Sequence, residues 1–199
     1  MTTQQRAEET RARILQAAAE CFAQYGYDAV GVAEICRRAG VTKGGFYHHF
    51  PSKQALFLEL VNRWLGGLDV QMEAARRGAA TVPEGLRQMA GMAQYVFDVA
   101  RGQIPLYLEF WAKAARDPVV WQATIEPYRR YRDFFRGIVE AGIAEGSLRP
   151  VNPERAAEVL VALAVGLLLQ GMLDPEGADW GEVMQEGVQI LLSGLEKER

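Results

Sequence analysis

Apolar residues recur at helical spacing along almost all of this 199-residue chain. Between residues 14 and 25 they stand three or four positions apart, which places them on one face of a helix. No segment alternates apolar and polar residues as a half-buried strand does, and the chain contains no internal repeat. The pattern therefore predicts an all-α fold of about nine helices.

Glycine and proline residues divide this pattern into separate helices. Gly26 and Gly40 end the first two, and Pro51 ends the third because the residue before a proline disfavours the helical conformation. Pro127 lies inside a later helix, which is either kinked or split there. After the first helix, the expected helices cover residues 32–39, 43–50, 53–77, 84–101, 105–116, 118–145, 153–173 and 180–197.

Charge is distributed unevenly between the beginning and the rest of the chain. The net charge of −3 excludes a protein that coats nucleic acid through bulk positive charge. Residues 1–53 nevertheless carry seven basic and five acidic residues, whereas residues 54–199 carry fifteen basic and twenty acidic ones. A basic head on an acidic body suggests an anionic partner for the head.

Several features point to a cytoplasmic protein. Cys21 and Cys36 stand in apolar-periodic segments, and we expect them to be small buried hydrophobes in a reducing compartment. The first residues hold no apolar core of a signal peptide. The most apolar run, residues 159–169, is well short of the roughly 20 residues that a membrane span needs. We expect no membrane partner.

The chain lacks the residue patterns of common enzymes. It has three serines and two adjacent histidines, and it contains no nucleophile elbow, phosphate-binding loop, dinucleotide-binding motif or zinc-protease motif. The cysteines and histidines do not have zinc-finger spacing. We therefore expect no catalytic residues, no metal site, no cofactor and no enzymatic activity.

Residues 32–50 have the pattern of a helix-turn-helix. Gly40 supplies the left-handed residue that the tight turn needs, and Thr42 is a good N-cap for the second helix. Phe46 and Phe50 then face inward, which leaves Lys43, Gly44, Tyr47 and His48 outward.

The second helix of this motif is poorly suited to a purely structural role. It has about two turns, and Gly44 and Gly45 would each cost roughly 0.8–1.0 kcal/mol against alanine. Glycines there would let the helix approach another backbone or a base edge, and Lys43, Tyr47, His48 and Lys53 are donors suited to phosphate. The alternative is a glycine-containing turn with an exposed basic rim.

Residues 12–57 resemble the DNA-binding domain of the TetR/AcrR family of bacterial regulators. The match runs in register without a gap. The residues that carry it are Ile14, Leu15, Ala18, Phe22, Gly26, Tyr27, Val32, Ile35, Ala39–Gly44, Phe46, Tyr47, His49, Phe50, Ser52, Lys53 and Leu56.

The resemblance implies roles for individual residues. The third helix would enter the major groove, with Thr42, Lys43, Gly44 and Tyr47 contacting bases and phosphates. His48 and Lys53 stand at positions that commonly contact phosphate. One departure matters, since the family usually has Ser or Thr where Gly31 stands. Glycine caps a helix nearly as well but cannot make the side-chain contact with phosphate.

Three arginines stand at or before the start of the first helix. Arg6, Arg11 and Arg13 could touch phosphates or a minor groove, as flexible basic arms do. For Arg11 and Arg13 we favour a solvated face with Glu8 and Glu9 as partners, and Arg6 is left open.

The sequence divides into a helix-turn-helix domain, residues 1–53, and an effector-binding and dimerisation domain, residues 54–199. One helix-turn-helix domain covers only one half-site of a DNA operator, so a two-fold dimer is expected. Apolar residues surround the helix over 156–172, and such a helix must be covered on all sides. The resemblance likewise implies a four-helix bundle of two partners, and we expect a homodimer through residues 153–197. The alternative is that these residues form core within one chain.

Aromatic residues concentrate in the middle of the chain. Residues 95–135 hold ten of the nineteen aromatics, and aromatics with methionines make adaptable apolar cavities. The resemblance implies an effector pocket here, and the alternative is plain core packing. The candidate pocket residues are Met89, Met92, Tyr107, Phe110, Trp111, Trp121 and Tyr128.

A group of arginines stands beside these aromatics, comprising Arg129, Arg130, Arg132 and Arg136. They form either a solvated helix face or the mouth of a site for an anionic ligand.

These observations predict a ligand-responsive transcriptional repressor. The dimer would hold a palindromic double-stranded DNA operator, and a small, largely apolar effector would release it by tilting the fourth helix, residues 53–77. The rival hypothesis is a small-molecule-binding helical protein or enzyme in which the helix-turn-helix is incidental.

Overall fold

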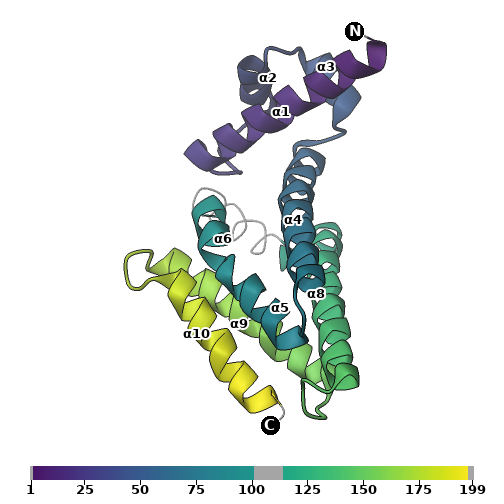
Figure 1. Ribbon diagram of the computed structural model, residues 1–199. Helices are drawn as coiled ribbons and strands as arrows, with labels where there is room; N and C mark the ends of the chain where they lie inside the picture. Colours follow the sequence, from purple (N-terminus) through teal and green to yellow (C-terminus); the bar gives the residue numbers. More distant parts are fainter. Residues whose placement is uncertain (1, 101–113, 197–199) are drawn as a thin grey trace. The chain divides into compact units, whose positions relative to one another are not determined.

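The structure, a computed structural model, describes residues 2–100 and 114–196 (Figure 1). Every regular element among them is a helix, apart from one isolated bridge between Leu148 and Glu196. The prediction of an all-α fold is confirmed. The helices are α1 (Thr3–Tyr25), α2 (Val32–Ala39), α3 (Lys43–His49), α4 (Lys53–Gly78), α5 (Val82–Gly91), α6 (Ala93–Ala100), α8 (Pro118–Glu145), α9 (Pro153–Leu173) and α10 (Trp180–Leu195).

Two helix predictions need comment. The single helix expected over 84–101 is wrong, because the chain turns at Met92, whose N–H donates to the carbonyl of Met89 at 3.1 Å. The α8 helix, in contrast, continues through Pro127 without being split. The helix expected over 105–116 lies mostly outside the described residues.

The chain forms two compact units. Among the described residues, the first unit contains 2–67 and 114–123, and the second contains 68–100 and 124–196. Both α4 and α8 contribute residues to each unit.

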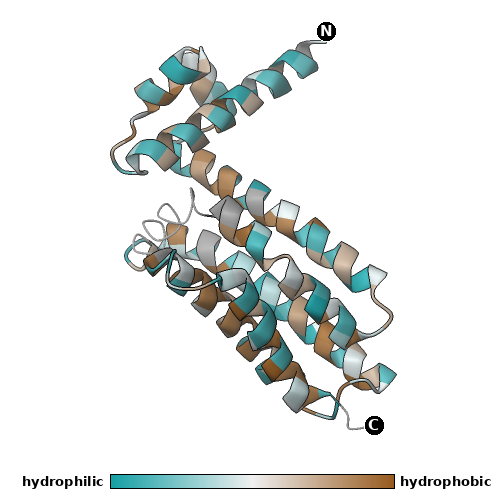
Figure 2. Cartoon of the chain, turned by 60° about the vertical axis from the view of Figure 1, so that its left-hand side comes forward, coloured by the Kyte–Doolittle hydropathy of each residue, from teal (hydrophilic) through white to brown (hydrophobic). Residues whose placement is uncertain are grey.

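The first unit has an aromatic core. Phe22, Tyr27 and Phe57 pack together with ring centroids 5.2 to 6.1 Å apart. Cys21 and Cys36 are buried and unoxidised, which confirms the expectation that they are buried hydrophobes. Figure 2 shows that hydrophilic residues dominate the N-terminal end of α1, beyond this core.

The second unit is a bundle in which α10 packs against α5, α6 and α9. Its core is continuous and mostly aliphatic. A Cβ at Gly171 would lie 2.8 Å from Cε1 of Phe97 and 3.0 Å from Cγ of Trp180. Glycine therefore allows α9 to touch α6 and the start of α10. No helix in the described ranges is long and apolar enough to cross a membrane.

Candidate nucleic-acid interface

The turn between α2 and α3 has the geometry that the sequence predicts. Gly40 adopts φ 66° and ψ 40°, a left-handed conformation that glycine tolerates at little cost. The N–H of Val41 then donates to the carbonyl of Cys36 at 3.0 Å, which closes α2. Ile35, Cys36 and Ala39 face inward and are buried. This turn fixes the direction in which α3 leaves α2.

The α3 helix is held by its cap and by its inner face. Thr42 Oγ1 accepts a hydrogen bond from the N–H of Gly45 at 3.1 Å. Phe46 is completely buried and its ring centroid lies 6.0 Å from that of Phe50. The predicted inward pair is therefore confirmed.

Packing among the described residues does not require the two glycines of α3. A Cβ at Gly44 would meet Thr42 Oγ1 at 3.8 Å, and one at Gly45 would meet it at 3.5 Å, which are ordinary contacts. Neither glycine has a positive φ. The helix therefore bears the propensity cost of two glycines without an internal reason, as expected if its exposed side approaches another molecule closely.

The outer face of α3 presents the predicted residues together. Thr42, Lys43, Gly44, Tyr47 and His48 are all exposed, and Tyr47 is 53% exposed although it is aromatic. Its ring stands edge-on to Phe46 at 5.3 Å, which steadies it against the helix. The face thus combines a cation, hydroxyl groups and an imidazole on one short helix.

Next to this face, the imidazole of His49 is partly buried. Burial lowers its pKa, and the neighbouring His48 and Arg11 lower it further. The lowered pKa disfavours the charged form of His49, and Lys43 supplies a cation on this helix.

Lys53 lies in a different environment from the other predicted site residues. Its ammonium donates to the carbonyls of Tyr27, at 2.7 Å, and Val30, at 2.9 Å. The same Nζ lies 4.2 Å from the centroid of the Tyr27 ring. The side chain is thus engaged with the loop between α1 and α2.

The arginines of the first unit differ in their partners. Arg11 pairs with Glu59 of α4 at 2.9 Å and lies over the Phe50 ring, so its partner is not the expected Glu8 or Glu9. Arg13 is exposed and lies 3.8 Å from the position of a Cβ at Gly40, which places it beside the turn.

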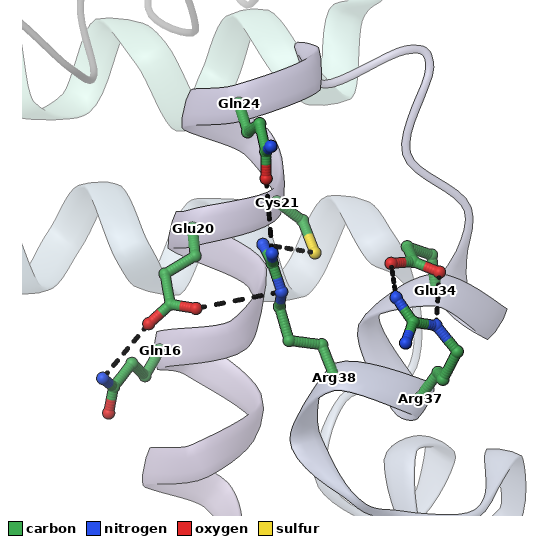
Figure 3. A network of polar contacts seen from close by, with 7 residues as sticks. All are labelled: Gln16, Glu20, Cys21, Gln24, Glu34, Arg37 and Arg38. Carbon is green, nitrogen blue, oxygen red and sulfur yellow. Dashed lines mark hydrogen bonds and ion pairs between the residues drawn. The ribbon is translucent and has the colours of Figure 1, made fainter.

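The arginines of α2 have structural partners that sequence reasoning missed (Figure 3). Arg38 reaches α1, where its Nη2 donates to Gln24 Oε1 at 3.3 Å and its Nη1 approaches Cys21 Sγ at 3.7 Å. Arg37 forms a bidentate pair with Glu34 on its own helix, at 2.6 and 2.9 Å. The spacing of three between Glu34 and Arg37 was the available signal for the second contact.

The described candidate effector residues differ in their exposure. Met89 and Met92 are half-buried, whereas Trp121 and Tyr128 are 47% and 40% exposed. Tyr107, Phe110 and Trp111 lie outside the described residues. Met89 also lines a hollow of about 120 Å³ within the second unit, together with Arg76, Leu86, Ile138 and Glu145, which sequence reasoning did not identify.

The arginine group on α8 is partly paired with carboxylates. Arg130 Nη2 lies 3.0 Å from Asp69 Oδ2 on α4, and Arg136 pairs with Asp133 at 3.5 Å. Arg129 is exposed and Arg132 is half-buried. The group is therefore not a uniformly solvated face.

Large apolar side chains are exposed on the last two helices. Val159, Leu169 and Leu173 on α9 are 50%, 39% and 73% exposed, and Ile190 on α10 is 65% exposed. The three α9 residues, with Gly166, follow a spacing of seven, three and four, so they share one stripe of the helix. No cluster of potential metal ligands occurs in the parts of the chain that are described.

Two family models match the chain. Residues 14–60 match a model described as bacterial regulatory proteins of the tetR family. Residues 83–195, more than half of the chain, match one described as the C-terminal part of BetI-type transcriptional repressors.

Individual proteins resemble it over nearly its whole length. The A-factor receptor protein of Streptomyces griseus is 29% identical over 97% of this chain, which spans only 66% of that protein. The HTH-type transcriptional regulator UidR of Escherichia coli K12 is 26% identical, with 96% of this chain and 95% of UidR covered. A crystal structure of a regulator from Saccharomonospora viridis in complex with choline superposes with a TM-score of 0.81 at 22% identity, covering 96% of this chain and all of the other.

Proposed function

The chain belongs to the TetR family of bacterial regulatory proteins, and on that basis we propose that it is a homodimeric repressor released from its operator by a small effector. The observation that carries the DNA-binding part is the exposed face of α3. There Lys43, Tyr47 and His48 stand beside two glycines that no contact among the described residues requires.

The chemistry of this face suits a major groove. Lysine and hydroxyl groups donate to phosphate oxygens and base edges. The glycines at the second and third positions of α3 leave room for a close approach to bases. We assign base and phosphate contacts to Thr42, Lys43, Gly44 and Tyr47, and a phosphate contact to His48.

The apolar stripe on α9 and α10 supports the homodimer. Val159, Leu169, Leu173 and Ile190 expose apolar surface that a second copy would cover. A Cβ at Gly166 would have no neighbour within 4 Å among the residues that the structure describes. A small residue in the middle of such a stripe permits close approach of a partner helix. Two-fold dimers of this kind place two readers about one turn of DNA apart.

The effector is proposed to be small and largely apolar, bound among aromatic and methionine side chains of the second domain. The choline complex of the S. viridis regulator supports a small organic ligand in this fold. Release requires that the effector favour the form that does not bind DNA, and a tenfold loss of operator affinity needs about 1.4 kcal/mol of coupling.

The test of DNA binding compares two exposed tyrosines of the first unit. Tyr47 lies on α3, whereas Tyr25 ends α1 and is 52% exposed. We expect Tyr47→Ala to weaken operator binding at least tenfold, measured by fluorescence anisotropy, and Tyr25→Ala to change it less than twofold. Equal affinities of the two variants would contradict the assignment of α3.

The test of the dimer uses two exposed apolar residues of the second unit. We expect Ile190→Arg to give monomers in analytical ultracentrifugation, because it places a charge in the proposed interface. Val70, on α4, is 72% exposed, and Val70→Arg is the matched control. Dimers that persist in Ile190→Arg, or monomers in both variants, would contradict the proposed interface.

A further inference from the structure

We infer that Lys53 positions the recognition helix by clamping the loop between α1 and α2, and that it does not hold a DNA phosphate. The inference rests on the proposed DNA-binding function and concerns how one residue serves it. The resemblance to the family implies the opposite role for this lysine, so the two assignments can be separated by experiment.

The clamp joins the start of α4 to both sides of the loop. Lys53 is the first residue of α4, and its ammonium donates to the carbonyls of Tyr27 and Val30, at 2.7 and 2.9 Å. These carbonyls lie three residues apart in the segment that leads from α1 to α2. A single side chain therefore ties the end of this loop to α4.

The positive charge of Lys53 stands at the N-terminus of α4, which is unfavourable unless a contact compensates for it. The helix dipole disfavours a cation near a helix N-terminus. Two carbonyl acceptors and the face of the Tyr27 ring, 4.2 Å from Nζ, supply that compensation. Two of the three N–H groups of the ammonium are thus committed to the loop.

The ring of Tyr27 makes the clamp rigid. It is buried, and its centroid lies 5.2 Å from that of Phe57, one turn further along α4, and 5.3 Å from that of Phe22 on α1. Burial raises the pKa of the Tyr27 hydroxyl, with a further contribution from Asp28. Two contacts thus hold the loop to α4: the packing of Tyr27 on Phe57 and the hydrogen bonds from the Lys53 ammonium.

The clamp reaches the DNA-reading surface through α2. Val30 precedes Gly31, the N-cap of α2, and Gly31 makes no side-chain cap of its own. The direction of α2 determines that of α3, because the turn at Gly40 is closed by a hydrogen bond from Val41 to Cys36. Fixing the carbonyl of Val30 therefore fixes where α3 points relative to the beginning of α4.

The experiment measures affinity for an operator and for a non-specific duplex over a range of salt concentrations. Lys53→Met keeps a long apolar side chain and removes the charge, and Lys43→Met is the matched control on the exposed face of α3. We expect Lys53→Met to weaken operator binding at least tenfold, with non-specific affinity within twofold and an unchanged salt slope. Lys43→Met should weaken both operator and non-specific binding. It should also reduce the slope of log affinity against log salt concentration by about 0.9, the value for one phosphate contact.

Two results would overturn the inference. A slope reduced by about 0.9 in Lys53→Met, with both affinities lowered, would make Lys53 a phosphate contact. Unchanged affinities with a lower melting temperature would make it a purely structural residue. If Lys53→Met does not fold, Lys53→Gln replaces it, since a neutral amide can still donate to the carbonyls, and the same slope criterion applies.

The failure of the proposed function would look different. In that case the unaltered protein would bind neither duplex in a salt-dependent manner, and the positioning role of Lys53 would fall with it. If the wild-type protein binds DNA and Lys53→Met reduces the salt slope by about 0.9, the positioning role of Lys53 is wrong but the DNA-binding function stands.

Discussion

Arg130 on α8 pairs with Asp69 on α4 at 3.0 Å, and this contact ties together two long helices of the second unit. The adjacent Tyr131 takes part in the same group. Burial raises the pKa of its hydroxyl, and a hydrogen bond to Asp69 and the charge of that carboxylate raise it further. The carboxylate of Asp69 thus serves both a guanidinium and a phenol.

Replacing Asp69 by asparagine should loosen this contact modestly. The Arg130 and Asp69 side chains are 52% and 36% exposed, and solvent-exposed pairs contribute about 0.2–1 kcal/mol. We expect Asp69→Asn to lower the free energy of unfolding by up to this amount and to lower the pKa of Tyr131. Urea unfolding and ultraviolet titration, with Tyr131→Phe to identify the tyrosine, measure the two effects.

The control for that variant is Asp133→Asn, which removes the longer Arg136 pair within α8. It should leave the pKa of Tyr131 unchanged. A Tyr131 that titrates identically in Asp69→Asn and the wild type would rule out the shared contact.

Replacing Gly31 by serine should increase both stability and operator affinity. Its φ of −89° and ψ of 155° suit any residue, and a Cβ there would meet nothing within 4 Å. Gly31→Ser should add the missing cap to α2, which is worth a few tenths of a kcal/mol, and should also strengthen operator binding if the serine reaches a phosphate. Thermal melting and operator anisotropy measure the two gains. Gly31→Ala has no cap oxygen, so equal effects of serine and alanine would exclude this explanation.

Glu73 should make α4 sensitive to strong acid. Its carboxylate accepts from Arg76 at 2.7 Å and from Arg77 at 2.6 Å, and these contacts lower its pKa from 4.5 to about 2. Because the folded-state pKa is depressed, the stabilisation is present above pH 4.5 and is lost as the pH falls towards 2. We expect the stability difference between wild type and Glu73→Gln to shrink over that window in urea unfolding. A difference that is constant from pH 5 to 2 would contradict the pKa of Glu73.

Gly171 should not tolerate a side chain. A Cβ would lie 2.8 Å from Phe97 and 3.0 Å from Trp180, and overpacking of this kind costs about 1–3 kcal/mol. Gly137, on α8, would have no neighbour within 4 Å, so Gly137→Ala should stabilise by roughly 0.5–1 kcal/mol through helix propensity. Chemical unfolding of both variants tests the contrast, and a neutral Gly171→Ala would refute the close approach.

The local structure of the helix-turn-helix could be predicted from the sequence because interactions between residues close in sequence determine it. Gly40 requires its left-handed turn, Thr42 caps α3, and the spacing of Phe46 and Phe50 sets the buried face. The sequence did not predict the break at Met92, because neither of the flanking residues, Gly91 and Ala93, is a proline. A single glycine inside an apolar pattern is a weak signal for the end of a helix.

The long-range partners of charged residues could not be predicted. Arg11 was expected to pair with near neighbours but reaches Glu59. The contacts of Lys53 with the carbonyls of Tyr27 and Val30 were not foreseen either, and the Lys53→Met experiment tests its predicted phosphate contact. Such pairings depend on tertiary packing, on which periodicity carries no information. The effector site stays a prediction, and Tyr107, Phe110 and Trp111 lie outside the described residues.

The central claim is that the protein reads DNA as a two-fold dimer, and selection of duplexes from a random pool tests it most directly. The purified protein, extracted to remove any bound effector, is incubated with the pool at low salt, and bound duplexes are sequenced. The account predicts an enriched palindrome whose half-sites match two copies of α3, lost when the selection is repeated with Tyr47→Ala. Recovery of an unenriched pool by the extracted wild-type protein would contradict it.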